Sequence, residues 1–147
     1  MKLMTALRLG PGEMVAFVGG GGKTSAMFRL AEEIVAGEGR VVTTTTTRIF
    51  AAQVGLAPAH WVAGERSVAE LAETLARTGH VLVTGRVEAG EGKAHGATPE
   101  AVDALRTLPG SPTVLNEADG SRMRPFKAPA AHEPVIPTGT TLVVPVV

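Results

Sequence analysis

Residues 14–25 of this chain read MVAFVGGGGKTS, an apolar run followed by four glycines, a lysine and two hydroxyl residues. Glycine has no Cβ, so backbone N–H groups in such a loop can approach an anion closely. Lys23 adds a cation that can reach the outer phosphates of a nucleotide, and Thr24 adds a hydroxyl suited to Mg²⁺. Residues 25–38 have a helical pattern, and a helix N-terminus also favours anions. The stretch therefore predicts a phosphate-binding loop between a strand and a helix.

The loop departs from the full Walker A pattern, G-x-x-x-x-G-K-[ST], because Phe17 occupies the position of the first glycine. The shorter form G-x-x-G-K-[ST] is present, and it is similar to the loop of the ATP-dependent Mur ligases. A glycine-rich hairpin with an incidental lysine is the alternative, and the order strand, loop, helix argues against it. We expect Lys23 to serve as a catalytic charge outside the core, and Thr24 to ligate Mg²⁺. The residues expected to bind the phosphates of ATP or GTP are Gly19, Gly20, Gly21, Gly22, Lys23, Thr24 and Ser25.

Strand and helix patterns alternate along the rest of the chain. Apolar strand patterns cover residues 14–18, 40–44, 60–63, 80–84, 113–116 and 140–144. Helical patterns cover residues 26–35 and 49–54, and two further helices begin at the capping box Ser67 to Glu70 and at the cap Thr98. Near-continuous apolar strands separated by helices predict a mainly parallel sheet with helices on both faces. The expected fold is α/β, a three-layer domain similar to P-loop NTPases, forming one nucleotide-binding domain over residues 1–147.

A second polar motif, EADGS at residues 117–121, follows the predicted strand at residues 113–116. In folds that hydrolyse nucleotides, an acidic residue at the end of a strand beside the phosphate loop holds Mg²⁺ or its water. We therefore expect Glu117 and Asp119 to be catalytic residues and metal ligands. The alternative is an acidic turn after a core strand.

Five threonines, residues 43–47, precede Arg48. The last of them lie past the end of the predicted strand, at the edge where open α/β sheets bind ligands. A hydroxyl there could join the Mg²⁺ shell, and Arg48 could neutralise charge in a transition state as a catalytic residue. The alternative is a polar strand end whose hydroxyls bond to the backbone.

Lys93 and His95 lie in a glycine-rich loop, residues 90–96, which either closes over a substrate or is simply solvated.

Composition limits the function further. Fourteen basic residues balance fourteen acidic ones among 147, so no global field attracts nucleic acid or an anionic membrane. Cysteine is absent, which excludes disulfides and thiolate metal sites and fits a reducing cytoplasm. No apolar run approaches the roughly 20 residues that a membrane helix needs. The chain stops in an apolar run at residues 142–147, and we expect it to be the N-terminal part of a longer native protein.

Four segments together resemble the YqeC family, whose members are accessory proteins of selenium-dependent molybdenum hydroxylases. They are GGGGKTS at residues 19–25, TTTTTR at 43–48, EADGSR at 117–122 and KAPAAHEPVIP at 127–137. The resemblance spans residues 15–147 and implies a nucleotide-dependent role in maturing such a hydroxylase or its cofactor. Three functions remain open. The protein could hydrolyse the nucleotide, it could transfer a phosphoryl group or act as a ligase similar to the Mur ligases, or it could deliver cofactor under the control of bound nucleotide without hydrolysing it. The chain has no N-K-x-D segment for guanine, so the choice between ATP and GTP is also open.

Overall fold

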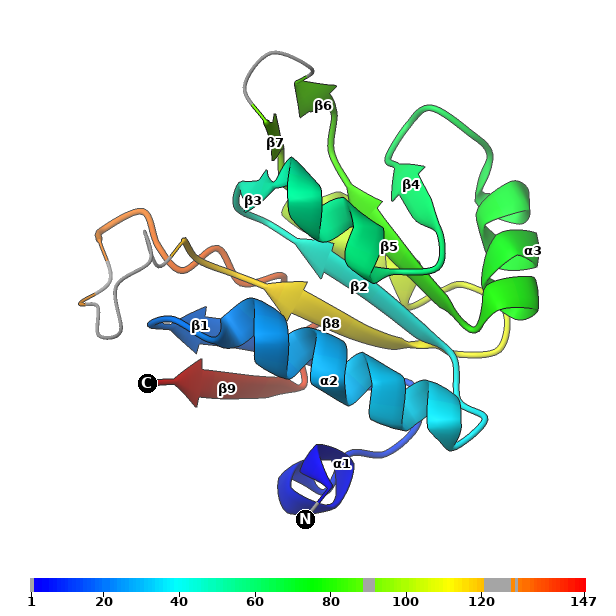
Figure 1. Ribbon diagram of the computed structural model, residues 1–147, viewed down its shortest axis with the longest axis horizontal. Coiled ribbons are helices and arrows are strands. Elements are labelled where there is room, and N and C mark those ends of the chain that lie inside the picture. The colour runs from blue at the N-terminus through cyan, green and yellow to red at the C-terminus, as the bar shows by residue number, and fades with distance from the viewer. Residues whose placement is uncertain (1, 89–91, 121–127, 129) are drawn as a thin grey trace.

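The computed structural model describes residues 2–88, 92–120, 128 and 130–147, and they form an α/β fold around one large sheet (Figure 1). Its six strands are β1 (Met14–Gly19), β2 (Val41–Thr45), β4 (His60–Val62), β5 (His80–Thr84), β8 (Thr113–Glu117) and β9 (Leu142–Val146). They lie in the order β4-β5-β2-β8-β1-β9, and every neighbouring pair is parallel. The predicted mainly parallel sheet is therefore confirmed.

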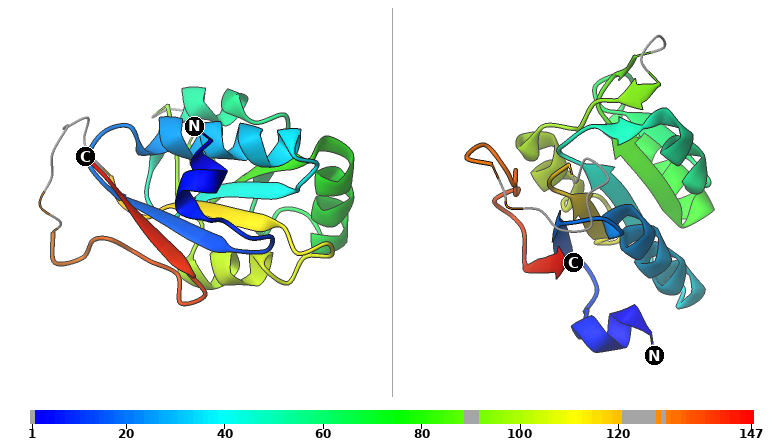
Figure 2. Two further views of the ribbon diagram at one scale, coloured as in Figure 1. Left: turned by 90° about the horizontal axis from the view of Figure 1, so that it is seen from below. Right: turned by 60° about the vertical axis from the view of Figure 1, so that its left-hand side comes forward.

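Helices cover both faces of this sheet (Figure 2). On one face lie α1 (Leu3–Leu7) and α2 (Lys23–Ala36), and on the other lie α3 (Val68–Thr78) and α4 (Pro99–Leu105). Successive strand residues point to opposite faces, so Val41 joins the core under α2 while Val42 joins the core under α3 and α4. This double burial explains why the strands read as continuous apolar runs rather than alternating ones.

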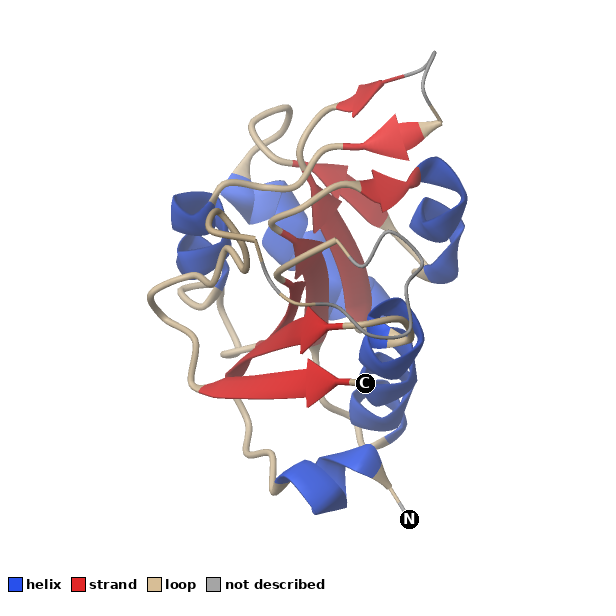
Figure 3. Cartoon of the chain, turned by 90° about the vertical axis from the view of Figure 1, so that its left-hand side faces the viewer, coloured by secondary structure: helices blue, strands red, loops and turns tan. Residues whose placement is uncertain are grey.

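The order of the strands in the sheet decides which strand ends lie next to one another. Although β2 follows β1 in sequence, β8 lies between them, with Phe17 and Thr45 as the register partners of Glu117 on either side. In parallel sheets the carboxyl ends of the strands share one edge. The loops after β1, β2 and β8 therefore converge at that edge. Figure 3 shows β9 beside β1 at the border of the sheet, with α1 below them.

A small antiparallel sheet lies beyond the carboxyl ends of β2 and β5 (Figure 1). It consists of β3 (Ile49–Phe50), β7 (Lys93–Ala94) and β6 (Val87–Glu88), with β7 in the middle. Backbone bonds fasten it to the large sheet, from Gly85 N–H to His95 C=O at 2.9 Å and from Ala97 N–H to Thr45 C=O at 2.8 Å. These bonds hold the small sheet close to the edge where the loops converge.

Most predicted elements are present, and the exceptions are short. Both expected helix caps form: Ser67 and Glu70 make a reciprocal capping box, and Thr98 accepts the N–H of Ala101. The short helix predicted at residues 49–54 is present two residues later as a 3-10 helix, η1 (Ala51–Leu56), because residues 49 and 50 form β3. The glycine-rich loop at 90–96 contains β7, the last strand lies two residues later than predicted, and α1 was missed. No helix in the described part of the chain is long and apolar enough to cross a membrane.

Candidate functional site

The glycine loop joins the carboxyl end of β1 to the first turn of α2. Gly19 and Gly22 have φ values of 103° and 95°, in the left-handed region that only glycine adopts readily. A Cβ on Gly19 would also lie 2.5 Å from the carbonyl oxygen of Val146 in β9. The loop can therefore take this path only with glycine at position 19.

The first turn of α2 presents N–H groups at the carboxyl edge of the sheet. The first bond of the helix runs from Ala26 N–H to Gly22 C=O at 2.9 Å. The N–H groups of Lys23, Thr24 and Ser25 come before it, so no preceding turn supplies their acceptors. With the helix dipole, such groups suit a bound anion.

Two N–H groups of the glycine loop are used within the protein. Gly19 N–H donates to Asp119 Oδ2 at 3.0 Å, and Gly20 N–H donates to the carbonyl of Val146 at 2.8 Å. Both bonds tie the loop to neighbouring strand ends. Of the loop N–H groups expected to hold phosphate, those of Gly20 to Thr24, the first therefore already has an acceptor within the protein.

Lys23 lies inside the loop and is 2% exposed, so the expectation that it stands outside the core was wrong. Its Nζ donates to the carbonyls of Gly19 and Gly20, each at 2.8 Å, and forms an ion pair with Asp119 Oδ1 at 3.1 Å. An ammonium group has three N–H bonds, and three acceptors lie within reach of them. Asp119, also 2% exposed, therefore serves as the counter-charge of Lys23 and as an acceptor for the loop.

Thr24 and Glu117 meet across the edge of the sheet. The Thr24 hydroxyl donates to Glu117 Oε2 at 2.7 Å, and Glu117 is the last residue of β8 and nearly buried. Burial raises the pKa of the Glu117 carboxyl, and this outweighs the opposing effects of the Thr24 hydrogen bond and the Lys23 charge. A hydroxyl and a carboxylate are the hard oxygen ligands that Mg²⁺ prefers, and a nearby cation would stabilise the charged carboxylate. The pair therefore fits the metal expected here better than Asp119 does.

Other acidic groups do not add to this pair. In the part of the chain that the structure describes, no group of three or more His, Asp or Glu side chains could hold a metal ion. Any Mg²⁺ at Thr24 would therefore take few protein ligands. That is the usual arrangement for Mg²⁺ sites completed by phosphate oxygens and water.

Gln53 is a site residue that the sequence did not reveal. It lies on η1, and its side-chain Nε2 donates to Thr24 Oγ1 at 3.3 Å. The contact depends on how β3 and η1 fold back over α2, and no local pattern around residue 53 signals it. Thr24 is thus approached by a carboxylate from β8 and by a carboxamide from η1.

The threonine run mainly fastens chain segments together. Thr45 Oγ1 donates to the backbone carbonyl of Glu117 at 3.0 Å, and Thr46 Oγ1 donates to that of Val135 at 2.6 Å. Thr43 Oγ1 pairs with His80 Nε2 at 2.9 Å inside the core. These contacts agree with the alternative interpretation of the threonine run, in which it is a polar strand end whose hydroxyls bond largely to the backbone. The bond to Val135 also joins the segment at residues 130–137 to the end of β2.

Three further candidates lie outside the loop. Arg48 is exposed between β2 and β3, and Lys93 is exposed on β7. His95 Nε2 pairs with Glu88 Oε1. The hydrogen bonds and the ion pair described for Lys23 and Thr24 go to other residues, namely Gly19, Gly20, Gln53, Glu117 and Asp119. Ser121 and Arg122, at the end of the acidic motif, lie outside the described residues.

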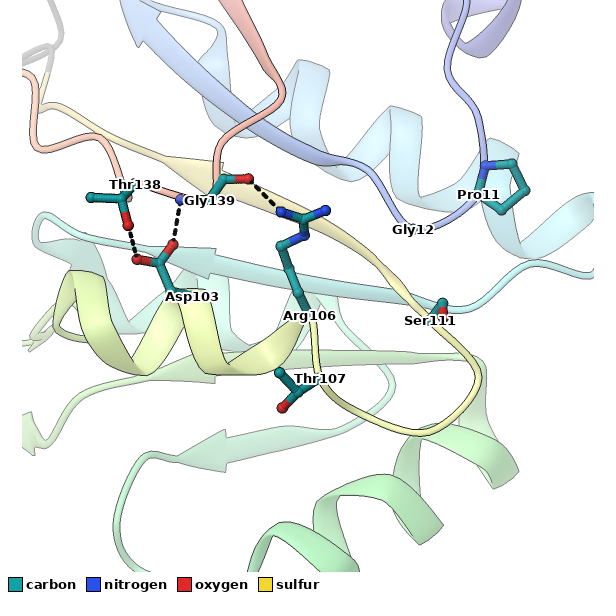
Figure 4. Close-up of a pocket in the computed structure, with 8 residues that line it drawn as sticks. All are labelled: Pro11, Gly12, Asp103, Arg106, Thr107, Ser111, Thr138 and Gly139. Carbon is teal, nitrogen blue, oxygen red and sulfur yellow. Dashed lines mark hydrogen bonds between the residues drawn. The ribbon is translucent and has the colours of Figure 1, made fainter.

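An open pocket of about 580 Å³ lies at the opposite, amino-terminal edge of the sheet (Figure 4). Asp103 accepts hydrogen bonds from the Thr138 hydroxyl at 2.7 Å and from Gly139 N–H at 2.8 Å, while Arg106 donates to the Gly139 carbonyl at 3.0 Å. These bonds fasten the segment before β9 to α4. The two charged side chains that line the pocket, Asp103 and Arg106, both take part in this structural contact.

Comparison with known proteins gives two matches and one absence. A family model described as YqeC protein matches residues 15–147. The chain is 41% identical over 134 residues to a protein of Escherichia coli (strain K12) described as "uncharacterized protein YqeC". The alignment covers 90% of this chain and 50% of that protein, so the chain spans about half the length of its relative. No solved structure matches.

Proposed function

This chain belongs to the YqeC family, and we propose that it binds ATP or GTP together with Mg²⁺ at the glycine loop and hydrolyses the nucleotide. The observation that carries the proposal is the contact between Thr24 Oγ1 and Glu117 Oε2 at 2.7 Å. A hydroxyl at a helix N-terminus and a buried carboxylate on the adjacent strand are the two protein groups that hold Mg²⁺ in phosphate-binding loops. Their meeting at the end of a glycine loop is hard to explain as packing alone.

Each group at the loop has a role in this proposal. The N–H groups of Gly21 to Ser25 hold phosphate oxygens, and Lys23 carries positive charge to the outer phosphates. Thr24 and Glu117 hold Mg²⁺, which when bound neutralises the charge on the phosphates. Because phosphoryl transfer needs little covalent chemistry from the protein, positioning and charge account for most of the catalysis. Arg48 is the proposed further source of positive charge.

Asp119 has a different role from Glu117 in this scheme. It pairs with Lys23 at 3.1 Å and accepts the N–H of Gly19 at 3.0 Å, so it holds the loop in shape before nucleotide arrives. A phosphate that attracts Lys23 competes with Asp119 and with the two loop carbonyls. Nucleotide binding is therefore expected to be coupled to movement of the Lys23 side chain.

The biological setting of the reaction rests on family resemblance. The four motifs that resemble the YqeC family imply a role in maturing a selenium-dependent molybdenum hydroxylase or its cofactor, and we extend the proposal to that role. Hydrolysis would then drive the maturation. A transferase or ligase reaction and non-hydrolytic gating predict different nucleotide chemistry, so one set of measurements separates them.

Phosphate release from ATP and GTP tests the proposal, measured with and without Mg²⁺ and with and without the candidate molybdenum cofactor. We expect Mg²⁺-dependent release by the wild type and none by the double variant Lys23→Met/Asp119→Asn. The double variant removes both buried charges together and so leaves neither unpaired. Lys2→Ala, at an exposed lysine before α1, serves as the matched control and should keep full activity. Equal phosphate release by wild type and double variant would contradict the proposal.

A further inference from the structure

We propose that the sheet carries a second binding site, which lies under residues 130–137 and takes a neutral cyclic amide. We call residues 130–137 the strap. The site lies on the face of the sheet opposite α2, so it is separate from the glycine loop and goes beyond the proposed function. Two observations carry the inference. They are a pair of buried polar atoms without partners among the described residues, and a cover that is fastened to the sheet through Val135.

The face of the sheet under α3 and α4 changes character along its central strands. At their amino ends the strands contribute large apolar residues to the core, namely Met14, Val42 and Val114. Two residues further along each strand, on the same face, lie Ala16, Thr44 and Asn116, which are all fully buried. Ala16 and Thr44 are the register partners of Asn116 on either side. We call these three residues the carboxyl row, and they are small or polar where the preceding row is large and apolar.

Two polar atoms of the carboxyl row, Thr44 Oγ1 and Asn116 Oδ1, have no hydrogen-bond partner among the described residues. Both atoms are buried, and a buried polar atom that stays unpaired costs stability. Thr44 and Asn116 are register partners on adjacent strands, so their side chains leave the same face about 4.8 Å apart. A single polar group that reaches this face can therefore bond to both atoms.

The strap is bonded to the strand ends beside the carboxyl row. Val135 N–H donates to the carbonyl of Ala118 at 2.8 Å, and Thr46 Oγ1 donates to the carbonyl of Val135 at 2.6 Å. Thr46 Oγ1 in turn accepts a hydrogen bond from Asn116 Nδ2 at 3.2 Å. These groups form a chain from the buried Asn116 side chain to the strap. Figure 2 (left) shows the strap, in orange, on the same side of the sheet as α4.

The strap is suited to open without unfolding of the sheet. Its exposed residues are Ala130, Ala131, His132 and Ile136. A further fixed point comes after the strap, where Asp103 accepts the N–H of Gly139 at 2.8 Å. Segments with exposed side chains open locally at a lower cost in free energy than the buried strands beneath them. Release of Val135 therefore uncovers the carboxyl row while the strands stay paired.

The class of ligand follows from the two atoms. A carboxamide oxygen only accepts hydrogen bonds, so Asn116 Oδ1 needs an N–H or O–H group, whereas the Thr44 hydroxyl can donate one. A cyclic amide presents an N–H and a C=O side by side on one edge and therefore matches this acceptor and this donor together. The carboxyl row is uncharged, which favours a neutral ligand, because no residue of the row would compensate a buried charge.

Titration of the whole chain with a small lactam, without nucleotide, tests the site. The chain contains one asparagine, Asn116, and one glutamine, Gln53, so a ¹⁵N-labelled sample gives two pairs of side-chain NH₂ signals. The variant Gln53→Ala identifies the Asn116 pair. We expect δ-valerolactam to shift the Asn116 pair along a saturable curve. N-methyl-δ-valerolactam lacks the N–H that would reach Asn116 Oδ1, and it should bind at least about tenfold more weakly.

A variant of Thr44 tests the contribution of its hydroxyl. Thr44→Val removes the hydroxyl with little change of shape, and it should weaken the binding of δ-valerolactam at least about tenfold. The thermal midpoint should stay the same or rise, because the buried Thr44 Oγ1 has no partner among the described residues that the variant would lose.

A variant of Val135 tests the opening of the strap. Val135→Gly should favour the open strap, because glycine gains the most backbone freedom when the segment is released. We expect the backbone N–H at position 135 to exchange about 5- to 20-fold faster and δ-valerolactam to bind more tightly by the same factor, since the apparent affinity follows the fraction of open molecules. Val147→Gly, at a valine that is 89% exposed, is the matched control and should change neither quantity.

Three outcomes would overturn the inference. The first is no saturable shift of the Asn116 pair with δ-valerolactam up to about 50 mM, and the second is equal binding of its N-methyl derivative. The third is a lower thermal midpoint for Thr44→Val without lactam binding, which would show a trapped water as the sole occupant. Because these measurements use no nucleotide, failure of the proposed nucleotide site would leave their results unchanged.

Discussion

The hydroxyl of Thr24 donates a hydrogen bond of 2.7 Å to a carboxylate oxygen of Glu117, a residue 93 positions later in the chain. The contact follows from the order of the strands. Because β8 lies next to β1, the end of β8 reaches the first turn of the helix that β1 leads into. Burial of the Glu117 carboxylate costs stability that the Thr24 hydrogen bond and the Lys23 charge do not fully offset, so the pair suits the metal site that we propose.

Replacing Glu117 by glutamine should stabilise the metal-free protein above pH 7. Burial raises the pKa of Glu117, so the folded state favours the protonated carboxyl, and that contribution to stability is lost as pH rises through the raised pKa. Glutamine imitates the protonated form at every pH. We expect Glu117→Gln to raise the free energy of unfolding by about 0.5–2 kcal/mol at pH 8 and to change it little at pH 4. Urea denaturation in EDTA at the two pH values measures this, and a loss of stability at pH 8 would contradict it.

Breaking the buried ion pair should be costly. Lys23 and Asp119 are each 2% exposed, so removing one partner leaves an uncompensated buried charge. We expect Asp119→Ala to lower the free energy of unfolding by about 3–5 kcal/mol. The double variant Lys23→Met/Asp119→Asn should lose much less unfolding free energy, because both charges are removed and neither is left unpaired. Chemical denaturation of the two variants and the wild type gives the comparison, and equal losses would show that the pairing is unimportant.

The glycine at position 19 should be indispensable, whereas Gly120 tolerates alanine. Gly19→Ala places a Cβ 2.5 Å from the Val146 carbonyl in a left-handed backbone, at a cost of at least about 1–3 kcal/mol. A Cβ on Gly120 has its nearest neighbours at 3.5 Å, on Thr47, and at 4.0 Å, on Glu133, both ordinary contacts. Thermal unfolding of the two variants should therefore separate them clearly. Similar midpoints would show that the loop adapts freely.

Acid should destabilise the protein partly through His80. Burial lowers the pKa of His80 from 6.5 to about 4, so the folded state favours the neutral ring. The unfolded chain takes up a proton below pH 6.5 that the folded chain does not, and stability falls as pH drops from 6.5 towards 4. The loss is on the order of 3 kcal/mol. We expect His80→Leu to flatten this part of the profile of unfolding free energy against pH, whereas an unchanged slope would exclude His80 as its cause.

The sequence predicted the parts of the site that are local. Strand, glycine loop and helix follow one another within residues 14–36, so their order could be read from glycine content and apolar spacing. The approach of Glu117 to this loop was expected from its place after a strand. Which strand lies next to β1, however, depends on the whole sheet and leaves no trace in a short stretch of sequence.

The features that the sequence did not predict are those set by distant packing. Lys23 was expected to bind the outer phosphates of a nucleotide. In the structure its ammonium group instead donates to the carbonyls of Gly19 and Gly20 and pairs with Asp119. Gln53 lies beside Thr24 just after β3, which pairs with β7 some forty residues later and includes the first two residues of the predicted helix. Short strands such as β3 and β7 have little preference of their own, and neighbours in space decide their form.

Calorimetric titration of ATP and GTP into the protein, with and without Mg²⁺, tests the central claim most directly. The account predicts that one of the two nucleotides binds and that its affinity falls at least about tenfold when Mg²⁺ is removed or when Thr24→Ala removes the proposed metal ligand. Ser25→Ala, the exposed neighbour in the same turn, should bind with nearly the affinity of the wild type, because its backbone N–H is retained. No binding of either nucleotide, or binding that is indifferent to both Mg²⁺ and the Thr24 hydroxyl, would contradict the account.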